Sequence, residues 1–88
     1  MKTAFRKSFI RDLKKIKNKQ VLLDVRQVID GVEAAAKLDD IRHLKKLVGG
    51  DNCYRIRMGE YRIGVSVVKS TVEFVRCLPR RDLYRFFP

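Results

Sequence analysis

Three arginines, Arg55, Arg57 and Arg62, lie in two short segments in which polar and apolar residues alternate. Such alternation predicts β-strands, and the glycine-containing break at positions 59–60 predicts a tight hairpin turn between them. In the register that a two-residue turn sets, Arg57 faces Arg62 and Arg55 faces Gly64, so the three guanidiniums share one face. Like charges on opposing strands destabilise the pair, and a guanidinium suits bidentate contact with a phosphate. The pattern therefore indicates a face that gains stability when an anion binds.

The same arginines also fit a simpler interpretation, in which they form a solvated sheet face that is screened by salt. Composition alone does not separate the two interpretations. Gly64 has no side chain, and we expect it to leave open space among the arginines in which a backbone or a base could lie.

The distribution of charge along the chain favours an anion-binding site over a solvated sheet face. The 88-residue chain carries 21 Lys and Arg against 10 Asp and Glu, a net charge of +11 that favours nucleic acid or an acidic protein as partner. Residues 1–50 hold nine Lys and four Arg, whereas residues 51–88 hold one Lys and seven Arg. Because lysine supplies diffuse attraction and arginine supplies directed phosphate contacts, we interpret the first half as a basic surface and the second as a site.

Length and composition predict a single domain over residues 1–88. Hydrophobic residues make up 45% of the chain and charged residues 35%, which argues against disorder and against a membrane span. Arg11 and Asp12 interrupt the basic start before any apolar signal region forms, so we expect a cytoplasmic protein. Cys53 and Cys77 are then expected to be reduced thiols, and with His43 they match no common metal-site spacing.

The elements that would position the arginines follow from hydrophobic periodicity. We predict an α+β fold of order β-α-α-β-β-β, in which a helical hairpin packs on a mostly antiparallel four-stranded sheet and a short helical turn ends the chain. The predicted strands are Lys2–Phe5, the two strands of the 53–68 hairpin and Thr71–Leu78. The predicted helices are Lys7–Lys17 and Lys19–Ala36, and one or two further turns fall within residues 80–87. Leu38–Gly50 is predicted to be a loop or a helical turn.

His43, the only histidine, falls in this loop-like stretch. A single histidine in a basic surface loop is usually just solvated. Imidazole is also a side chain well suited to proton transfer near neutral pH, and the sequence leaves both roles open.

Three segments, LKKLVGG, YRIRMGEYRIGV and RRDLY, follow the predicted strand and helical hairpin. Through them the chain resembles, over nearly its full length, the RelE/ParE toxin superfamily and in particular its RelE-like ribonuclease branch. The resemblance implies the toxin of a toxin–antitoxin pair that enters the ribosomal A site, cleaves messenger RNA there and so inhibits translation. In that branch the ribose 2′-hydroxyl attacks the adjacent phosphate, and neither a metal nor another cofactor is used. The implied partners are messenger RNA, the ribosome and a cognate antitoxin, which we expect to be acidic.

The resemblance also implies which residues act, with arginines holding the phosphate and a tyrosine orienting or stacking on a base. The expected catalytic residues are Arg55, Arg57, Arg62, Arg80, Arg81 and Tyr84. The residues expected to bind RNA beside them are Lys45, Lys46, Arg76 and Arg85. Tyr84 also fits a simpler role as a residue that packs in the core or the tail.

Two positions depart from the family pattern. Where one family arginine lies six residues before the tyrosine, this chain has Leu78, and either Arg80 or Arg81 is expected to substitute. Where the family often has a lysine, this chain has Arg57, which does not readily lose a proton. The group that moves protons is therefore left open between three candidates, namely the ribosome, His43 and Glu60.

Two other functions stay open from the sequence. A ParE-like toxin would share the fold, bind DNA gyrase and lack a ribonuclease site, and a small basic domain would bind nucleic acid without cutting it. The arginine set and Tyr84 favour the ribonuclease. We expect an antitoxin to dock on an exposed tail that includes Phe86 and Phe87, and there to block ribosome entry or displace the region around Tyr84.

Overall fold

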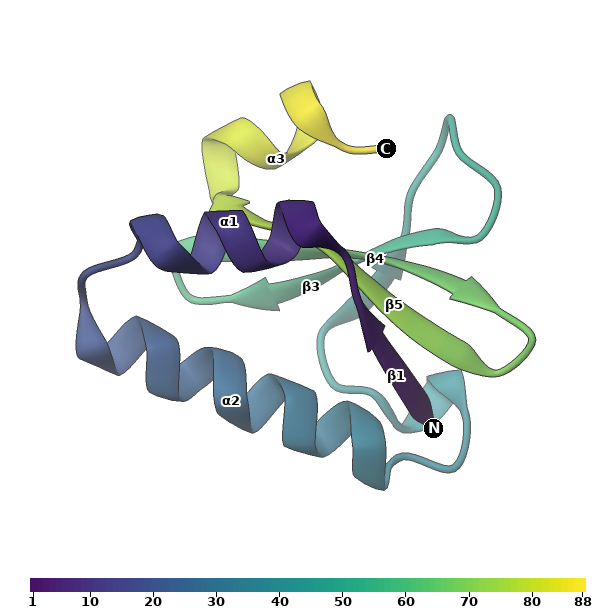
Figure 1. Cartoon of the computed structure of the whole chain (residues 1–88). Coiled ribbons are helices and arrows are strands. Elements are labelled where there is room, and N and C mark those ends of the chain that lie inside the picture. The colour runs from purple at the N-terminus through teal and green to yellow at the C-terminus, as the bar shows by residue number, and fades with distance from the viewer.

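The computed structural model describes all of residues 1–88 and forms one five-stranded sheet with helices on both of its faces (Figure 1). The strands are β1 (Lys2–Phe5), β2 (Leu44–Lys46), β3 (Cys53–Met58), β4 (Tyr61–Val68) and β5 (Thr71–Pro79). The α-helices are α1 (Lys7–Lys15), α2 (Lys19–Ala34) and α3 (Arg80–Phe86), and a short 3₁₀ helix, η1 (Leu38–Asp40), precedes β2. The predicted α+β class is confirmed, and the two helices of the hairpin end slightly earlier than predicted.

The sheet has the order β1-β5-β4-β3-β2, with β1 parallel to β5 and the other neighbours antiparallel. The sequence predicts four of these strands, and that strand count is wrong because β2 lies in the stretch expected to be a loop or helical turn. β2 is only three residues long, which is too short to show a period-two pattern. It forms because Leu44–Lys46 pairs with the edge of β3.

The hairpin of β3 and β4 has the predicted register, in which Arg57 pairs with Arg62 and Arg55 pairs with Gly64. The turn begins at Gly59, whose φ of 57° lies in the left-handed region that glycine adopts without a Cβ clash. The turn thus decides which face of the sheet each hairpin side chain occupies.

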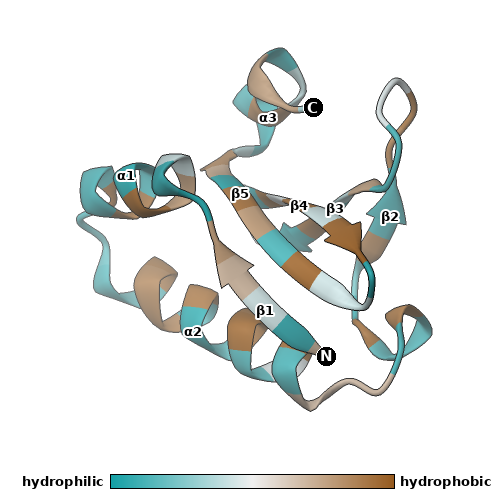
Figure 2. Cartoon of the chain, turned by 45° about the vertical axis from the view of Figure 1, so that its right-hand side comes forward, coloured by the Kyte–Doolittle hydropathy of each residue, from teal (hydrophilic) through white to brown (hydrophobic).

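One face of the sheet carries the main hydrophobic core. Buried Ile56, Ile63 and Phe74 of the sheet pack in one cluster with Phe9 of α1 and Val32 of α2. Figure 2 shows the corresponding pattern, with apolar and polar bands alternating along β5 and apolar bands on the two helices. The helical hairpin therefore covers one face of the sheet, as predicted.

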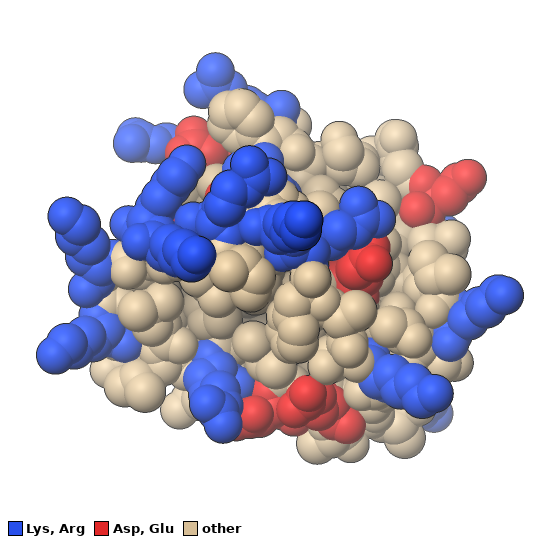
Figure 3. Space-filling model, in the orientation of Figure 1, with Lys and Arg blue, Asp and Glu red and all other residues tan.

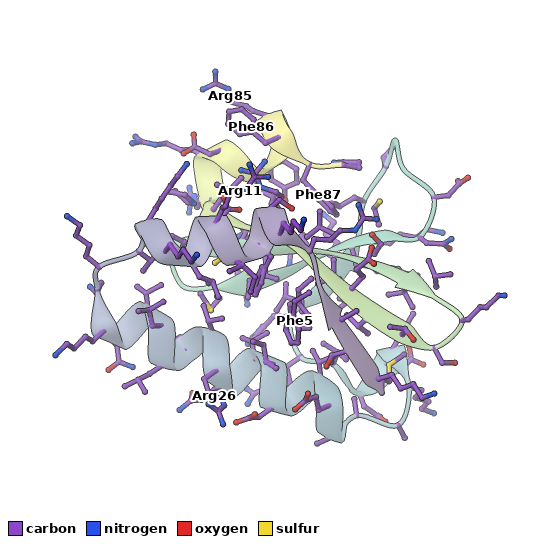
Figure 4. The ribbon with its side chains drawn as sticks, viewed as in Figure 1. Phe5, Arg11, Arg26, Arg85, Phe86 and Phe87 are labelled. Carbon is purple, nitrogen blue, oxygen red and sulfur yellow. The ribbon has the colours of Figure 1, made fainter.

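The opposite face is covered in part by α3 and the tail. Leu83 and Phe87 are buried in a second cluster with Leu47, and Figure 4 shows Phe87 between α3 and the sheet. The expectation of an exposed tail holds for Phe86, which is 54% exposed, and is wrong for Phe87, which is 5% exposed. The open space expected beside Gly64 is also absent, because the ring of Phe87 fills it.

No helix of the structure combines the length and the apolar character that crossing a membrane would require. Cys53 on β3 is half-buried, Cys77 on β5 is buried, and both are free thiols. Burial raises the pKa of the Cys77 thiol to about 12, and the negative charge of Asp12 contributes to the rise.

Candidate functional site

Four arginines and a tyrosine come together on the side of the sheet opposite the main core. We call this set the arginine face, and it comprises Arg55, Arg57, Arg62, Arg80 and Tyr84. The hairpin register places the first three on adjacent strands. The backbone N–H of Arg80 donates to the carbonyl oxygen of Glu60 at 2.8 Å, which ties the start of α3 to the hairpin turn. Because of this hydrogen bond, Arg80 and Tyr84 of α3 lie on the same side of the sheet as the hairpin arginines.

Arg62 lies at the centre of the arginine face. Its Nη1 donates to the carbonyl oxygens of Gly59 at 2.7 Å and Tyr61 at 2.9 Å, so the hairpin turn itself orients the guanidinium. Desolvation lowers the pKa of the Arg62 guanidinium, and the like charges of the other three arginines of the face lower it further. A bound anion would relieve this repulsion, because an opposite charge favours the charged form.

Arg55 has a donor without a partner. Its Nη1 donates to the carbonyl oxygen of His43 at 2.7 Å, whereas its Nε is buried and forms no hydrogen bond. Buried donors in native proteins are nearly always paired, so an unpaired guanidinium nitrogen is a second sign that this face lacks a hydrogen-bond acceptor.

His43 lies at the edge of the arginine face. Its Nδ1 is 3.1 Å from Nη2 of Arg57, and because arginine only donates, Nδ1 is the acceptor of this hydrogen bond. Its backbone has φ of 62°, in the left-handed region, where histidine is one of the more tolerated residues. The sequence places His43 in a loop, and the structure adds the contact with Arg57.

Arg76, expected to bind RNA, is engaged elsewhere. Its Nε lies 2.8 Å from Oδ2 of Asp12 and its Nη2 lies 3.1 Å from Oδ1, and this hydrogen bonding raises the pKa of Arg76. Asp12 is buried and also accepts the backbone N–H of Cys77 at 2.9 Å. The pair joins α1 to β5, so we assign Arg76 a structural role and leave it out of the proposed RNA contacts.

The register of β2 separates the two lysines expected to bind RNA. Lys45 pairs with Arg55 and therefore lies on the side of the arginine face. Lys46 pairs with Tyr54, which packs on the main core, and so it lies on the other side of the sheet. Lys45 alone of these two lies on the same side of the sheet as the arginines.

The two remaining candidates lie on the exposed surface of α3. Arg81 is exposed and is not among the charges that act on Arg62, whereas Arg80 is. The guanidinium of Arg85 lies 5.5 Å from the centroid of the exposed Phe86 ring (Figure 4), and the guanidinium of Arg76 lies 5.6 Å from the same centroid. Arg85 is thus presented to solvent together with an aromatic surface.

Sequence reasoning missed the burial of Asp12, although a signal for it exists. Phe9, Asp12, Leu13 and Ile16 follow one another at helical spacing, so Asp12 lies within the apolar stripe of α1. A carboxylate in such a stripe implies a buried partner, but the sequence does not show that the partner is Arg76.

Basic side chains also spread beyond the arginine face. In the view of Figure 3, Lys and Arg gather over α1 and α3. The exposed basic residues of these two helices are Lys7, Arg11, Lys14, Lys15, Arg80, Arg81 and Arg85. They extend the positive charge of the molecule beyond the arginine face, and this charge would attract a polyanion.

Known proteins share both the sequence and the fold of this chain. The model of a family described as ParE toxin of type II toxin–antitoxin system, parDE, matches residues 4–84. Toxin RelE3 of Methanocaldococcus jannaschii is 37% identical over 89 residues, which cover 100% of both chains. A chain of the RelB–RelE antitoxin–toxin complex from Methanococcus jannaschii is 35% identical and has a TM-score of 0.79, covering 97% of this chain and 99% of that one. A chain of the RelE–RelB complex from Pyrococcus horikoshii OT3, 22% identical with a TM-score of 0.72 over 90% and 93% of the two chains, has the same fold.

Proposed function

Because the chain belongs to the RelE/ParE superfamily of toxins from type II toxin–antitoxin systems, we propose that it is a ribosome-dependent endoribonuclease that cleaves messenger RNA in the A site. One observation carries the proposal. Four arginines and an exposed tyrosine, drawn from β3, β4 and α3, meet on one side of the sheet and leave the charge of Arg62 unbalanced.

The proposed chemistry is attack by a ribose 2′-oxygen on the adjacent phosphorus. The O2′–P bond forms as the P–O5′ bond breaks, which leaves a cyclic phosphate and a free 5′-hydroxyl. Negative charge builds on the non-bridging oxygens, and guanidiniums held in place by Gly59, Tyr61 and His43 would stabilise it without reorganising. Losing one such donor typically lowers a rate about 10²–10³-fold.

The residues of α3 would hold the RNA strand around that phosphate. Tyr84 is 60% exposed, so its ring is free to stack on an unpaired base, a contact worth about 1–3 kcal/mol. We propose that Arg80 substitutes for the family arginine at the position of Leu78, because Arg80 and not Arg81 acts on Arg62. Lys45 and Arg85 are the proposed flanking RNA contacts.

A ParE-like toxin that binds DNA gyrase is the second candidate, because the matching family model is that of ParE toxins. That function would use the same fold without cleavage. It gives no role to the arginine face, which is the reason that we favour the ribonuclease.

The relatives described in complex with RelB support a cognate antitoxin for this chain. We propose that its binding segment is acidic, since it must cover a chain of net charge +11. It would cover the arginine face or displace the region around Tyr84. A purified complex that cut ribosome-bound message as fast as the free toxin would contradict this mode of inhibition.

The experiment that separates the two candidate functions uses the free toxin in two assays. Primer extension on a reporter message in programmed ribosomes is expected to show new 5′ ends within the A-site codon. A supercoiling assay with DNA gyrase is expected to show no inhibition. The reverse pair of results would replace the ribonuclease by a gyrase-binding toxin on the same fold.

A further inference from the structure

We infer that His43 is the proton-transfer residue of this site and that it takes the proton of the attacking 2′-hydroxyl on Nδ1. The inference rests on the proposed ribonuclease function and supplies the group that the arginines lack. A guanidinium does not act as a base under ordinary conditions, so a face built from four arginines can hold the phosphate but cannot accept the proton.

The structure holds His43 firmly beside the site. Its carbonyl oxygen accepts two hydrogen bonds, from Nη1 of Arg55 at 2.7 Å and from the backbone N–H of Arg57 at 3.2 Å. Its Nδ1 accepts a third, from Nη2 of Arg57 at 3.1 Å. One residue is therefore bound through both its backbone and its ring by two arginines that face the proposed phosphate position.

The hydrogen bond from Arg57 suggests how the base is released. In the free protein Arg57 occupies the lone pair on Nδ1. A phosphate oxygen carries charge and is a stronger acceptor for a guanidinium than a ring nitrogen, so bound RNA would draw Nη2 of Arg57 away. Nδ1 is then unoccupied next to the phosphate whose neighbouring ribose carries the nucleophile.

The proton and the electron pairs balance in this step. The 2′-hydroxyl proton passes to Nδ1 of His43, giving an imidazolium, while the 2′-oxygen bonds to phosphorus. The P–O5′ bond breaks, and the 5′-oxygen takes a proton from water. The imidazolium later loses its proton to solvent, which restores the starting state.

His43 lies between the arginine face and an open cleft on the α2 side of the sheet. His43 lines a cleft of about 480 Å³ between α2 and the edge of β3. The charged groups that line this cleft with His43 are Asp24 of α2, Asp40 and Arg42 of the segment before β2, and Arg57 of β3. Arg55 contacts His43 from the arginine face. Glu60, the other carboxylate near the hairpin, forms no salt bridge with the arginine face.

Two substitutions separate proton transfer from a structural role. His43→Asn keeps a residue that tolerates the left-handed backbone and keeps an acceptor oxygen for Arg57, but it removes the ring nitrogen that would take the proton. His43→Gly keeps the backbone conformation and leaves space for added imidazole. Arg26→Ala, on the exposed side of α2, is the matched control for the loss of a surface side chain.

The readout is the single-turnover rate of A-site cleavage on programmed ribosomes between about pH 5 and pH 8, the range in which imidazole titrates. The wild-type rate is expected to rise with pH and then level off. His43→Asn is expected to be slower by about 10²-fold or more, with that rise lost, and to cosediment with ribosomes as the wild type does. Added imidazole is expected to restore part of the activity of His43→Gly.

Two results would overturn the inference in different ways. If the wild type cuts and His43→Asn cuts at nearly the same rate with the same pH profile, His43 is not the base and the ribonuclease stands. If the wild type makes no cut on programmed ribosomes, the ribonuclease proposal fails and the role of His43 fails with it.

Discussion

The ring of Phe87 lies against the backbone of Gly64, so that a Cβ built at residue 64 would meet Cδ2 of Phe87 at 2.6 Å. Gly64 pairs with Arg55, and Phe87 directly follows the helix that carries Arg80 and Tyr84. This contact therefore connects the tail to the arginine face and, with buried Leu83, holds α3 against the sheet.

Gly64→Ala should force the ring of Phe87 away and move α3. Overpacking of this kind destabilises a protein by about 1–3 kcal/mol, and cleavage should fall because Tyr84 is displaced. Urea unfolding and the A-site cleavage assay measure the two effects. The control is Gly31→Ala in α2, where nothing lies within 4 Å of the added Cβ and the higher helix propensity should stabilise by up to about 1 kcal/mol. Equal stability and activity of Gly64→Ala and the wild type would mean that the tail does not depend on this contact.

Asp12→Asn should be strongly destabilising. It leaves the partly buried Arg76 without its counter-charge, and removal of one partner from a buried pair costs about 3–5 kcal/mol. Asp30→Asn is the matched control, because it breaks the exposed Arg26–Asp30 pair at 3.5 Å and should cost about 0.5 kcal/mol or less. Urea unfolding of the two variants compares them directly, and similar losses would show that the Asp12 pair is not structural.

Cys77 should make stability fall at alkaline pH. The pKa of its thiol is about 12 in the folded protein against an ordinary value of 9.0, so between these values the unfolded chain releases a proton that the folded chain keeps. The unfolded state is then favoured by up to about 1.4 kcal/mol per pH unit, whereas below the ordinary value the thiol has no effect. Because lysines and tyrosines also titrate in this range, the test is the difference in pH slope between the wild type and Cys77→Ala. Identical slopes would contradict the prediction.

The hairpin could be predicted from the sequence because residues that are close together in the chain determine it. Alternation fixes the two faces, and Gly59 fixes the turn, so the pairing of Arg57 with Arg62 follows without knowledge of the rest of the chain. β2 could not be predicted, since its three residues form a strand only by pairing with β3.

The parts of the site that the sequence does not reveal depend on contacts between distant residues. In the sequence nothing distinguishes Arg76 from the other arginines of residues 51–88, because its pairing with Asp12 appears only in the fold. Gly64 suggests open space in the sequence, because the sequence does not show that the ring of Phe87 packs onto it. The contact of His43 with Arg57 needs both the pairing of β2 and a left-handed backbone at residue 43.

Tyr84 should act through its ring. Tyr84→Phe keeps the surface on which a base stacks and should retain most of the cleavage rate, whereas Tyr84→Ala should lose about 1–3 kcal/mol of RNA interaction. Cleavage at increasing concentrations of toxin, on programmed ribosomes, separates weaker binding from slower chemistry. A Tyr84→Phe variant as impaired as Tyr84→Ala would assign the role to the hydroxyl group instead.

The proposed site of RNA cleavage is the arginine face, and substitution of Arg62 tests this assignment most directly. The measurement is the single-turnover rate of A-site cleavage for Arg62→Ala beside Arg26→Ala, two variants that each remove one arginine. We expect Arg62→Ala to lose about 10²–10³-fold in rate while Arg26→Ala stays at the wild-type value. Equal rates for the two variants would contradict the account and place the function of this toxin elsewhere on the fold.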